Sequence, residues 1–379
     1  MKDDGITYKT HYFQKTVDTS AYSGFVLGAD IGGTSTNVAV AGITDDTIDL
    51  LFSLDFETKK ISSFLPALKK TIAFARNKYD ICILNGCVGA AGIVSSDHSF
   101  VELTNVSWNI NAKELIKETA MDSLFILNDF QVLGYGINTI DLSDEKDVSI
   151  IRKNVSIDTK EPRVLLGAGT GLGKTILRYD QKNRFFHAFE SEGGHADIPV
   201  YTRTEFDLIK TIQQRKHSHY PVSYEDLLSG EGIVDIYSFL RSKQLFKDSE
   251  YSELIDTAED KPAIISNYRS KDEYCTETFR LFQRFFARCA KNLGLDTLAK
   301  GGVFIAGGIA EKNKDIFLSN QFIDEFNRSH TREKYLKEIP LYLLTNYYLS
   351  LQGACFAAFH APTILNHQKN VKRRGEGRL

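Results

Sequence analysis

The sequence has no long apolar run and no apolar segment near its start. No stretch approaches the roughly 18 consecutive apolar residues that a membrane-spanning helix needs. The N-terminal segment also lacks the apolar region of a secretory signal peptide. We therefore expect no membrane association, and we interpret residues 1–23 as a flexible N-terminal extension.

Paired cysteines are missing as well. The five cysteines are scattered along the chain, and no two of them form a C-x-x-C pair. This spacing indicates neither a disulfide framework nor a zinc site. Reduced, buried thiols in a cytoplasmic protein are the simplest interpretation of Cys82, Cys87, Cys275, Cys289 and Cys355.

Neither sign of charge dominates. The net charge is −3 over 379 residues, which gives no argument for a nucleic-acid or membrane surface. The basic end "NVKRRGEGRL" mixes its charges with other residues, so we interpret residues 366–379 as a flexible, solvated tail. Hydrophobic residues make up 42% and charged residues 25%, as in ordinary globular proteins, and the length suffices for two domains.

What the sequence does contain is a mixture of strand and helix patterns. Two apolar runs joined by glycines predict a β-hairpin at 24–30 and 37–43. Apolar residues at helical spacing predict helices, and short buried runs predict strands. The remaining elements predicted in this first part are strands at 49–58, 81–89 and 123–130 and helices at 63–79, 111–120 and 131–140.

A polar stretch at 141–162 separates this part from a second one. The second part opens with a strand, a glycine turn and another strand at 163–177. Because both parts begin with a glycine-turned hairpin, the sequence resembles an internal duplication. The other predicted elements are helices at 204–216, 223–229, 231–242 and 272–294, and a strand leading through glycines into a helix at 300–313.

The turn in "RVLLGAGTGLGKTIL" has the Lys-Thr pair of a phosphate-binding P-loop but not its spacing. Ala168 stands where a P-loop ending in Gly173-Lys174-Thr175 needs its first glycine. The dinucleotide pattern fails too, because Leu172 occupies the position of its last glycine. The residues after the turn alternate as a strand rather than a helix. We therefore predict a strand–turn–strand whose backbone amides can hold phosphate.

A second glycine turn follows the first strand. Gly32 and Gly33 let a ligand approach the backbone, Thr34 can donate a hydrogen bond to a phosphate oxygen, and Asp30 can orient a metal-bound water. An ordinary hairpin turn uses the same residue types. The presence of two such turns favours a polyphosphate site.

Several polar residues stand where predicted elements begin or end. Asn128 and Asp129 end a buried strand, where ligands of open α/β sheets bind and a carboxylate can accept a proton from a hydroxyl. Asp129 could instead cap the following helix. Glu192 and His195 flank two glycines and can hydrogen-bond a polyol, whereas a metal site lacks further ligands nearby. Glu225 lies in the first turn of a helix, a place that the helix dipole alone favours for a carboxylate.

Six motifs carry a family resemblance. "GADIGGT", "ILNDF", "GAGTGLG", "EGGH", "LLSGEG" and "GGVFIAGGI" occur in the order of bacterial-type ATP-dependent glucokinases, over about residues 24–360. These enzymes belong to the sugar kinase/actin/Hsp70 superfamily, and the cysteine-rich zinc motif of its ROK branch is absent. The resemblance implies an α/β fold with two ribonuclease-H-like (actin/hexokinase-type) domains and a ligand cleft between them. It places 24–139 plus 346–365 in a small domain and 140–345 in a large one.

The resemblance also implies an activity and its residues. The γ-phosphoryl group of ATP would pass to the glucose 6-hydroxyl, with Mg²⁺, as in the first step of glycolysis. Asp129 matches the general base and Asn128 a neighbouring sugar contact. The other implied sugar ligands are Asn105, Glu192, His195 and Glu225. The implied ATP-binding residues are Asp30, Gly32, Gly33 and Thr34 in the first phosphate turn, Gly169, Thr170 and Gly171 in the second, and Gly307 and Gly308 beside adenosine. Mg²⁺ is implied to come with ATP, with Asp30 reached through water and no direct protein ligand.

Two positions depart from the family. Asn37 stands where arginine is common, and Lys174 stands where relatives carry a small apolar residue. Lys174 either reaches toward phosphate or points to solvent, and we favour solvent. Alternative functions are phosphorylation of another hexose or an amino sugar, or sugar sensing without catalysis. The expected partners are glucose and ATP, with a homodimer left open and no nucleic acid.

Overall fold

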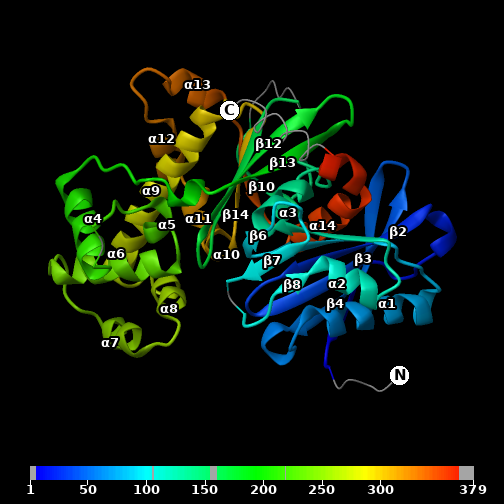
Figure 1. Ribbon diagram of the computed structural model, residues 1–379. Coiled ribbons are helices and arrows are strands. Elements are labelled where there is room, and N and C mark those ends of the chain that lie inside the picture. The colour runs from blue at the N-terminus through cyan, green and yellow to red at the C-terminus, as the bar shows by residue number, and fades with distance from the viewer. Residues whose placement is uncertain (1–5, 105, 154–159, 218, 367–379) are drawn as a thin grey trace. The chain divides into compact units, whose positions relative to one another are not determined.

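The computed structural model describes residues 6–104, 106–153, 160–217 and 219–366 (Figure 1). Asn105 and residues 367–379 of the predicted tail therefore lie outside the described residues. The chain divides into two compact units. Unit 1 consists of Met1–Asp141, Tyr179–Glu190 and Asn346–Leu379, and unit 2 of Leu142–Arg178 and Ser191–Thr345.

Unit 1 is built on a six-stranded sheet with the order β1-β4-β3-β2-β5-β9. Strands β2, β3 and β4 form an antiparallel meander, and β5 and β9 continue the sheet parallel to β2. This arrangement confirms the predicted hairpin and the predicted α/β class. The strands are β1 (Lys9–Tyr12), β2 (Gly24–Ile31), β3 (Ser35–Thr44), β4 (Thr47–Glu57), β5 (Asn85–Ala90) and β9 (Ser123–Asn128).

Helices cover both faces of this sheet. Leu27 and Ala29 of β2 belong to a core with α1 (Phe64–Tyr79) and α2 (Ala112–Glu118), while Val26 belongs to a second core with α3 (Asp129–Gly136) and α14 (Leu349–Phe359). Successive side chains of a strand point to opposite faces, so one strand contributes to both cores. Gly28 allows α14 to come close, because a Cβ there would lie 2.7 Å from the backbone nitrogen of Cys355.

Some elements of unit 1 differ from the sequence prediction. We predicted that residues 1–23 form a flexible extension, but this segment contains β1, which pairs antiparallel with β4. The prediction is therefore wrong for Lys9–Tyr12. Strand β1 pairs the edge of β4 that would otherwise be free, and the Tyr8 ring packs against Phe56 and Phe74. A small separate sheet was also missed, because its strands are too short to show periodicity: β6 (Gly92–Val94), β7 (Phe100–Leu103) and β8 (Ile110–Asn111).

Unit 2 repeats the same strand plan. The β11–β12 hairpin is followed in space by β14 and β15, each parallel to its neighbour, as β5 and β9 follow the β2–β3 hairpin. This correspondence supports the internal duplication. Strand β10 pairs with β15 and lies in the stretch that we predicted to be a polar linker. The strands are β10 (Val148–Arg152), β11 (Arg163–Ala168), β12 (Leu172–Asp180), β13 (Phe185–Ser191), β14 (Gly302–Ala306) and β15 (Leu341–Leu344).

The helices of unit 2 gather around α9 (Glu273–Asp296), the predicted long helix. Arg288 of α9 is fully buried, and its Nη1 lies 3.0 Å from Oε2 of Glu205.

No helix in the described ranges has both the length and the apolar character of a membrane span. The other helices are α4 (Arg203–Arg215), α5 (Tyr224–Leu227), α6 (Gly230–Ser242), α7 (Glu250–Thr257), α8 (Lys261–Asn267), α10 (Gly308–Lys312), α11 (Lys314–Phe317), α12 (Asn320–Asn327) and α13 (Glu333–Glu338).

The outer part of the β12–β13 hairpin, residues 179–190, groups with unit 1, although we expected it in the large domain. Contacts within unit 1 explain this. Gln131 Nε2 donates to the Ala188 carbonyl at 2.9 Å, and the Asn138 side chain both donates to and accepts from the backbone of Phe186. Residues of α3 and its C-terminal end therefore hold the hairpin.

Candidate active site

In unit 1, three parallel strands end in register. Ile31 of β2 lies opposite Ala90 of β5, and Ala90 lies opposite Asn128 of β9. The polar residues Asp30, Asn128 and Asp129 are thus at the carboxyl edge of the sheet, where open α/β sheets bind ligands.

Asn128 and Asp129 have different structural roles. Asn128 caps α3, because its Oδ1 accepts a hydrogen bond from the Phe130 amide at 2.9 Å. Asp129 is the first residue of the helix, and its Oδ1 accepts from the same amide at 2.8 Å. The N-cap role that we considered for Asp129 therefore belongs to Asn128. A partly exposed carboxylate at the helix start is placed to receive a proton from a bound hydroxyl.

Asp30 is electrostatically coupled to Asp129. Burial and then the charge of Asp129 raise the pKa of Asp30 to about 7, opposed by a hydrogen bond from the Ser350 side chain at the start of α14. Two carboxylates near each other disfavour ionisation of both, and a cation between or beside them would relieve the repulsion. The surroundings of Asp30 and Asp129 therefore suit a positively charged ligand.

The first glycine turn is held by Thr58, which follows β4. Thr58 Oγ1 donates to the Gly32 carbonyl at 2.8 Å, and its backbone amide donates to the Thr34 carbonyl at 2.9 Å. The Thr34 side chain is exposed, so its hydroxyl faces outward from a fixed backbone. We did not identify Thr58 from the sequence, because nothing in the sequence shows that it reaches this turn.

The second glycine turn, residues 169–171, joins β11 to β12 in unit 2. Gly169 N donates to the Gly171 carbonyl at 2.8 Å, and Gly230 N donates to the Gly169 carbonyl at 2.9 Å. A strand follows the turn, as predicted, whereas a P-loop needs a helix there. The turn is therefore not a P-loop.

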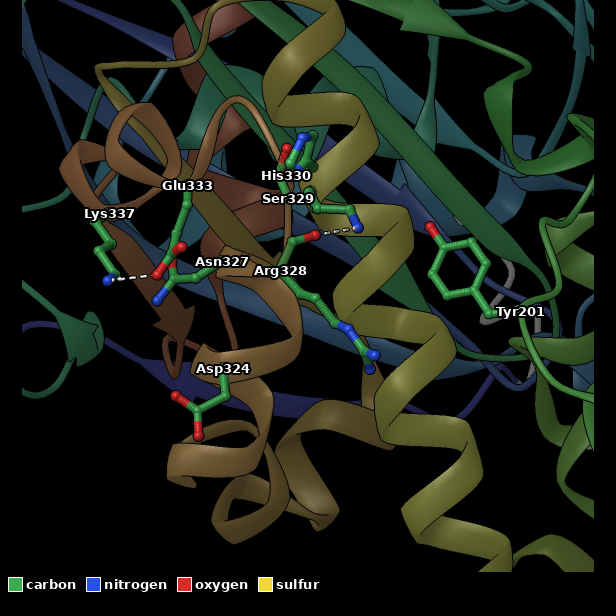
Figure 2. Close-up of a pocket in the computed structure, with 9 residues that line it drawn as sticks. Tyr201, Asp324, Asn327, Arg328, Ser329, His330, Glu333 and Lys337 are labelled. Atoms are coloured by element: carbon green, nitrogen blue, oxygen red, sulfur yellow. Dashed lines mark hydrogen bonds and ion pairs between the residues drawn. The ribbon is translucent and has the colours of Figure 1, made fainter.

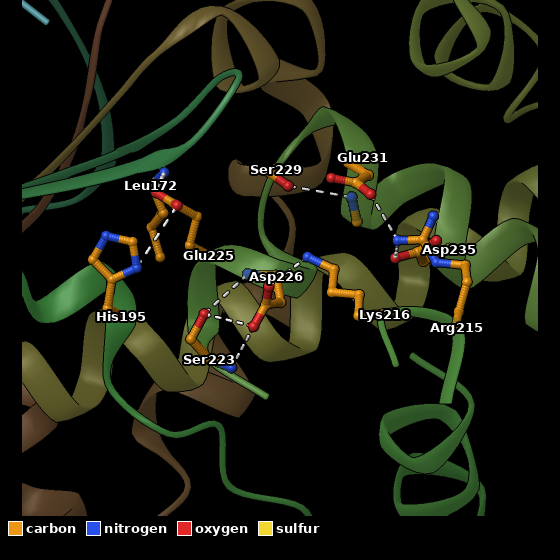
Figure 3. Close-up of polar contacts among 11 residues, drawn as sticks. Leu172, His195, Arg215, Lys216, Ser223, Glu225, Asp226, Ser229, Glu231 and Asp235 are labelled. Atoms are coloured by element: carbon orange, nitrogen blue, oxygen red, sulfur yellow. Dashed lines mark hydrogen bonds and ion pairs between the residues drawn. The ribbon is translucent and has the colours of Figure 1, made fainter. Parts of the chain in front are cut away.

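The predicted sugar ligands of unit 2 lie together beside this turn. Glu225 Oε2 accepts a hydrogen bond from the Leu172 amide at 2.8 Å. His195 Nδ1 lies 3.8 Å from Glu225 Oε1, and His195 Nε2 lies 3.6 Å from Glu192 Oε2. Figure 3 shows His195 and Leu172 both facing the Glu225 carboxylate. The arrangement offers two carboxylates and an imidazole to a ligand with several hydroxyl groups.

Glycines allow these segments to approach each other. A Cβ at Gly171 would lie 2.6 Å from Glu225 Oε2, and a Cβ at Gly194 would lie 2.2 Å from the Leu172 carbonyl oxygen. Ser223 caps α5, as expected, by accepting from the Asp226 amide at 3.2 Å. The spatial proximity of Glu225 to Leu172 could not be inferred from the sequence, because 53 residues separate them.

The third glycine segment links β14 to α10. Gly307 has φ +92°, a conformation that L side chains rarely adopt, and a Cβ there would lie 2.5 Å from the Ala168 carbonyl oxygen. Since β11 and β14 are parallel with Gly167 opposite Ala306, the Gly307–Gly308 segment lies at the same sheet edge as the second glycine turn. The two segments assigned to ATP in unit 2 are therefore neighbours.

Lys174 does not point to solvent, so our expectation for it is wrong. Its exposed fraction is 6%, and its Nζ donates to the Gly193 carbonyl at 2.6 Å. The strand pattern contains the reason: Lys174 alternates with Leu172 and Ile176 on the face of β12 that meets the unit 2 core.

A groove of about 760 Å³ elsewhere in unit 2 contains none of the predicted site residues (Figure 2). Tyr201 and Lys291 line it together with residues between 324 and 337. Its charges are mixed, and Lys337 pairs with Glu333. Among the described residues, no group of three or more His, Cys, Asp or Glu residues could hold a metal ion.

Comparisons with known proteins identify the family and agree with the fold. Residues 27–361 match the family model described as Glucokinase. A glucokinase from Nostoc punctiforme is 28% identical over 347 residues, which are 88% of this chain and 98% of the relative. A solved glucokinase from an Antarctic psychrotroph aligns with a TM-score of 0.73 at 23% identity, over 89% of this chain and 99% of that chain. The glucokinase from Balamuthia mandrillaris, solved in complex with glucose, aligns with a TM-score of 0.72 at 22% identity, over 89% of this chain and 94% of that chain.

Proposed function

The chain belongs to the glucokinase family and is an ATP-dependent hexose kinase, and we propose how its residues carry out the transfer. The observation that carries the proposal is the position of Asp129 at the carboxyl edge of the unit 1 sheet, beside Asp30. The predicted family and activity are confirmed, and the residue roles below are our assignment.

We assign Asp129 as the general base. The glucose 6-hydroxyl attacks the γ-phosphorus of ATP, a bond forms between these atoms, and the bond from the γ-phosphorus to the bridging oxygen of ADP breaks. The hydroxyl proton passes to Asp129. Asn128, Glu192, His195 and Glu225 hold the other hydroxyl groups so that the reacting oxygen is positioned for attack.

We assign the glycine segments to ATP. The turn of Gly32, Gly33 and Thr34 in unit 1 and the turn of Gly169, Thr170 and Gly171 in unit 2 offer the exposed hydroxyl groups of Thr34 and Thr170 to the phosphates. The turns also offer those backbone amides that they do not use themselves, whereas Gly32 N donates to the Ser35 carbonyl and Gly169 N to the Gly171 carbonyl. Gly307 and Gly308 leave room for the adenosine. Backbone donors that are already fixed need little reorganisation when charge develops on the phosphates.

Mg²⁺ fits the Asp30 side of this site. The like charge of Asp129 is one cause of the raised pKa of Asp30, and a cation would remove that penalty. Bound with ATP, Mg²⁺ would offset the charge of the β- and γ-phosphates. Asp30 is the residue that we assign to this metal, which it would hold through water.

The assigned sugar ligands belong to both units, so we propose that glucose contacts residues of both. We also propose a cytoplasmic location, since all five cysteines are free and four are buried, in keeping with a reducing compartment. A homodimer is the alternative to a monomer, and sedimentation velocity distinguishes the two states.

Steady-state kinetics with ATP, Mg²⁺ and a panel of hexoses and amino sugars tests the substrate. We expect the highest kcat/KM for glucose, with transfer to its 6-hydroxyl. A higher value for another sugar would assign the enzyme to that sugar. Sugar binding without turnover of any panel member would point to a sensor instead.

A further inference from the structure

Lys174 is a buried cation with unusual partners. Besides the Gly193 carbonyl, its Nζ lies 4.6 Å from the centroid of the Tyr224 ring and forms a hydrogen bond with the thiol of Cys289 in α9. No carboxylate of the described residues forms an ion pair with it. Burying an ammonium without an anionic partner is costly, so the contacts it makes must compensate.

Two of these partners, Gly193 and Tyr224, belong to the two segments that carry the proposed sugar ligands. Gly193 begins η3 (Gly193–His195), so fixing its carbonyl orients the short turn that carries Glu192 and His195. Tyr224 directly precedes Glu225, and a cation over its ring face is attracted to the π electrons. A single side chain on β12 therefore contacts both segments.

Other contacts make this arrangement rigid. Tyr224 N donates to the Ala196 carbonyl at 2.9 Å, and the Tyr224 hydroxyl accepts from Asn292 Nδ2 at 2.7 Å. Strand β12 begins at Leu172, whose amide donates to Glu225. A displacement of the Lys174 ammonium would consequently shift Glu225 and the turn that begins at Gly193. The contacts of Lys174 given above include no residue of the glycine turn at 169–171.

We propose that Lys174 is a positioning residue for sugar recognition, which holds the Glu192–His195 turn and the start of α5 in their binding arrangement. The proposal rests on the proposed function in one respect, namely that Glu192, His195 and Glu225 bind the sugar. It assigns Lys174 to the sugar side of the site, although the residue follows a phosphate-binding turn in sequence.

Lys174→Met tests the proposal, because methionine keeps the length and apolar stem but removes the charge and the donor. We expect the KM for glucose to rise about 10-fold or more, as for loss of a hydrogen bond from a charged group, with the KM for ATP unchanged within about 3-fold. Lys174→Arg retains the charge and the donors and should restore part of the loss. Lys182→Met, an exposed lysine in the same hairpin, is the matched control and should leave both constants unchanged.

The outcomes separate the possible roles. A rise in the KM for ATP alone would overturn the proposal and assign Lys174 to phosphate. A lower melting temperature with both KM values unchanged would show a purely structural residue and would also overturn it. If Lys174→Met does not fold, Lys174→Gln, which keeps an N–H donor without charge, is measured instead with the same expected selectivity for glucose.

One more variant distinguishes failure of this proposal from failure of the proposed function. Glu225→Gln should raise the KM for glucose if Glu225 binds sugar. If Glu225→Gln has this effect and Lys174→Met does not, only the positioning role fails. If Glu225→Gln leaves the KM for glucose unchanged, the sugar assignment fails and the role of Lys174 fails with it.

Discussion

Asp30, near the end of β2, and Asp129, directly after β9, lie at one sheet edge, and burial and then the charge of Asp129 raise the pKa of Asp30 to about 7. Asp30 therefore keeps its proton to a higher pH than an ordinary aspartate, and a cation bound beside it would favour its ionisation.

Asp129→Asn should abolish turnover while glucose still binds. The amide keeps the size of the side chain and removes its ability to accept a proton, so kcat should fall about 10²–10⁴-fold. Asp122→Asn, at an exposed aspartate of the same unit, is the control. Steady-state kinetics together with calorimetric glucose titration checks this, and a near wild-type kcat would remove Asp129 from the mechanism.

The raised pKa of Asp30 makes the ligand-free protein less stable as pH rises. In the folded state Asp30 holds its proton up to pH of about 7, whereas in the unfolded state it ionises near 3.8. The contribution of Asp30 to the free energy of unfolding is therefore complete below the pKa of the unfolded state and is lost as pH rises through the pKa of the folded state. The loss is at most about 4 kcal/mol. Asp30→Asn cannot ionise, so its free energy of unfolding should increase relative to wild type as pH rises from about 4 to about 7. Thermal unfolding across this range checks the prediction, and a pH-independent difference between the two proteins would contradict the raised pKa of Asp30.

The adjacent glycines Gly307 and Gly308 should respond differently to alanine. Gly307→Ala places a Cβ 2.5 Å from the Ala168 carbonyl oxygen at a φ of +92°, so we expect a loss of roughly 1–3 kcal/mol in the free energy of unfolding. The Cβ that Gly308→Ala adds would have no heavy atom within 4 Å, so the melting temperature of this variant should equal that of wild type. If adenosine lies against this segment, Gly308→Ala should still raise the KM for ATP. Equal melting temperatures for the two variants would contradict the strain argument.

The long periodic elements of both units could be predicted from the sequence, and the short ones could not. The two hairpins, α1 and α9 show strong apolar periodicity. Strands β6, β7 and β8 span only two to four residues, too few to show a period. Strand β1 depends on the free edge of β4, a tertiary feature that no local pattern records.

The residue types of the site could be predicted, but not the contacts that hold them. Family motifs indicated Glu225 and the turn at 169–171, whereas the hydrogen bond from Leu172 to Glu225 joins distant parts of the chain. Thr58 and Ser350 support the first phosphate turn and Asp30 from other elements, and neither lies in a motif. Lys174 was misjudged because lysine is almost always exposed, and its place among apolar residues of β12 was given less weight than its charge.

Glucose should bring the two units closer together in solution. Asn128 and Asp129 belong to unit 1, and Glu192, His195 and Glu225 belong to unit 2, so a sugar that binds all of them favours a closed state by its differential affinity. The chain passes between the units near residues 141–142, 178–179, 190–191 and 345–346, where the joints for such a motion would lie. Small-angle scattering should show a smaller radius of gyration at saturating glucose. Glu225→Ala should weaken this response by removing a contact from unit 2, while Glu231→Ala, at an exposed glutamate that pairs with Arg215, should not. An unchanged radius of gyration, in protein shown by calorimetry to be saturated with glucose, would mean that the sugar does not bridge the units.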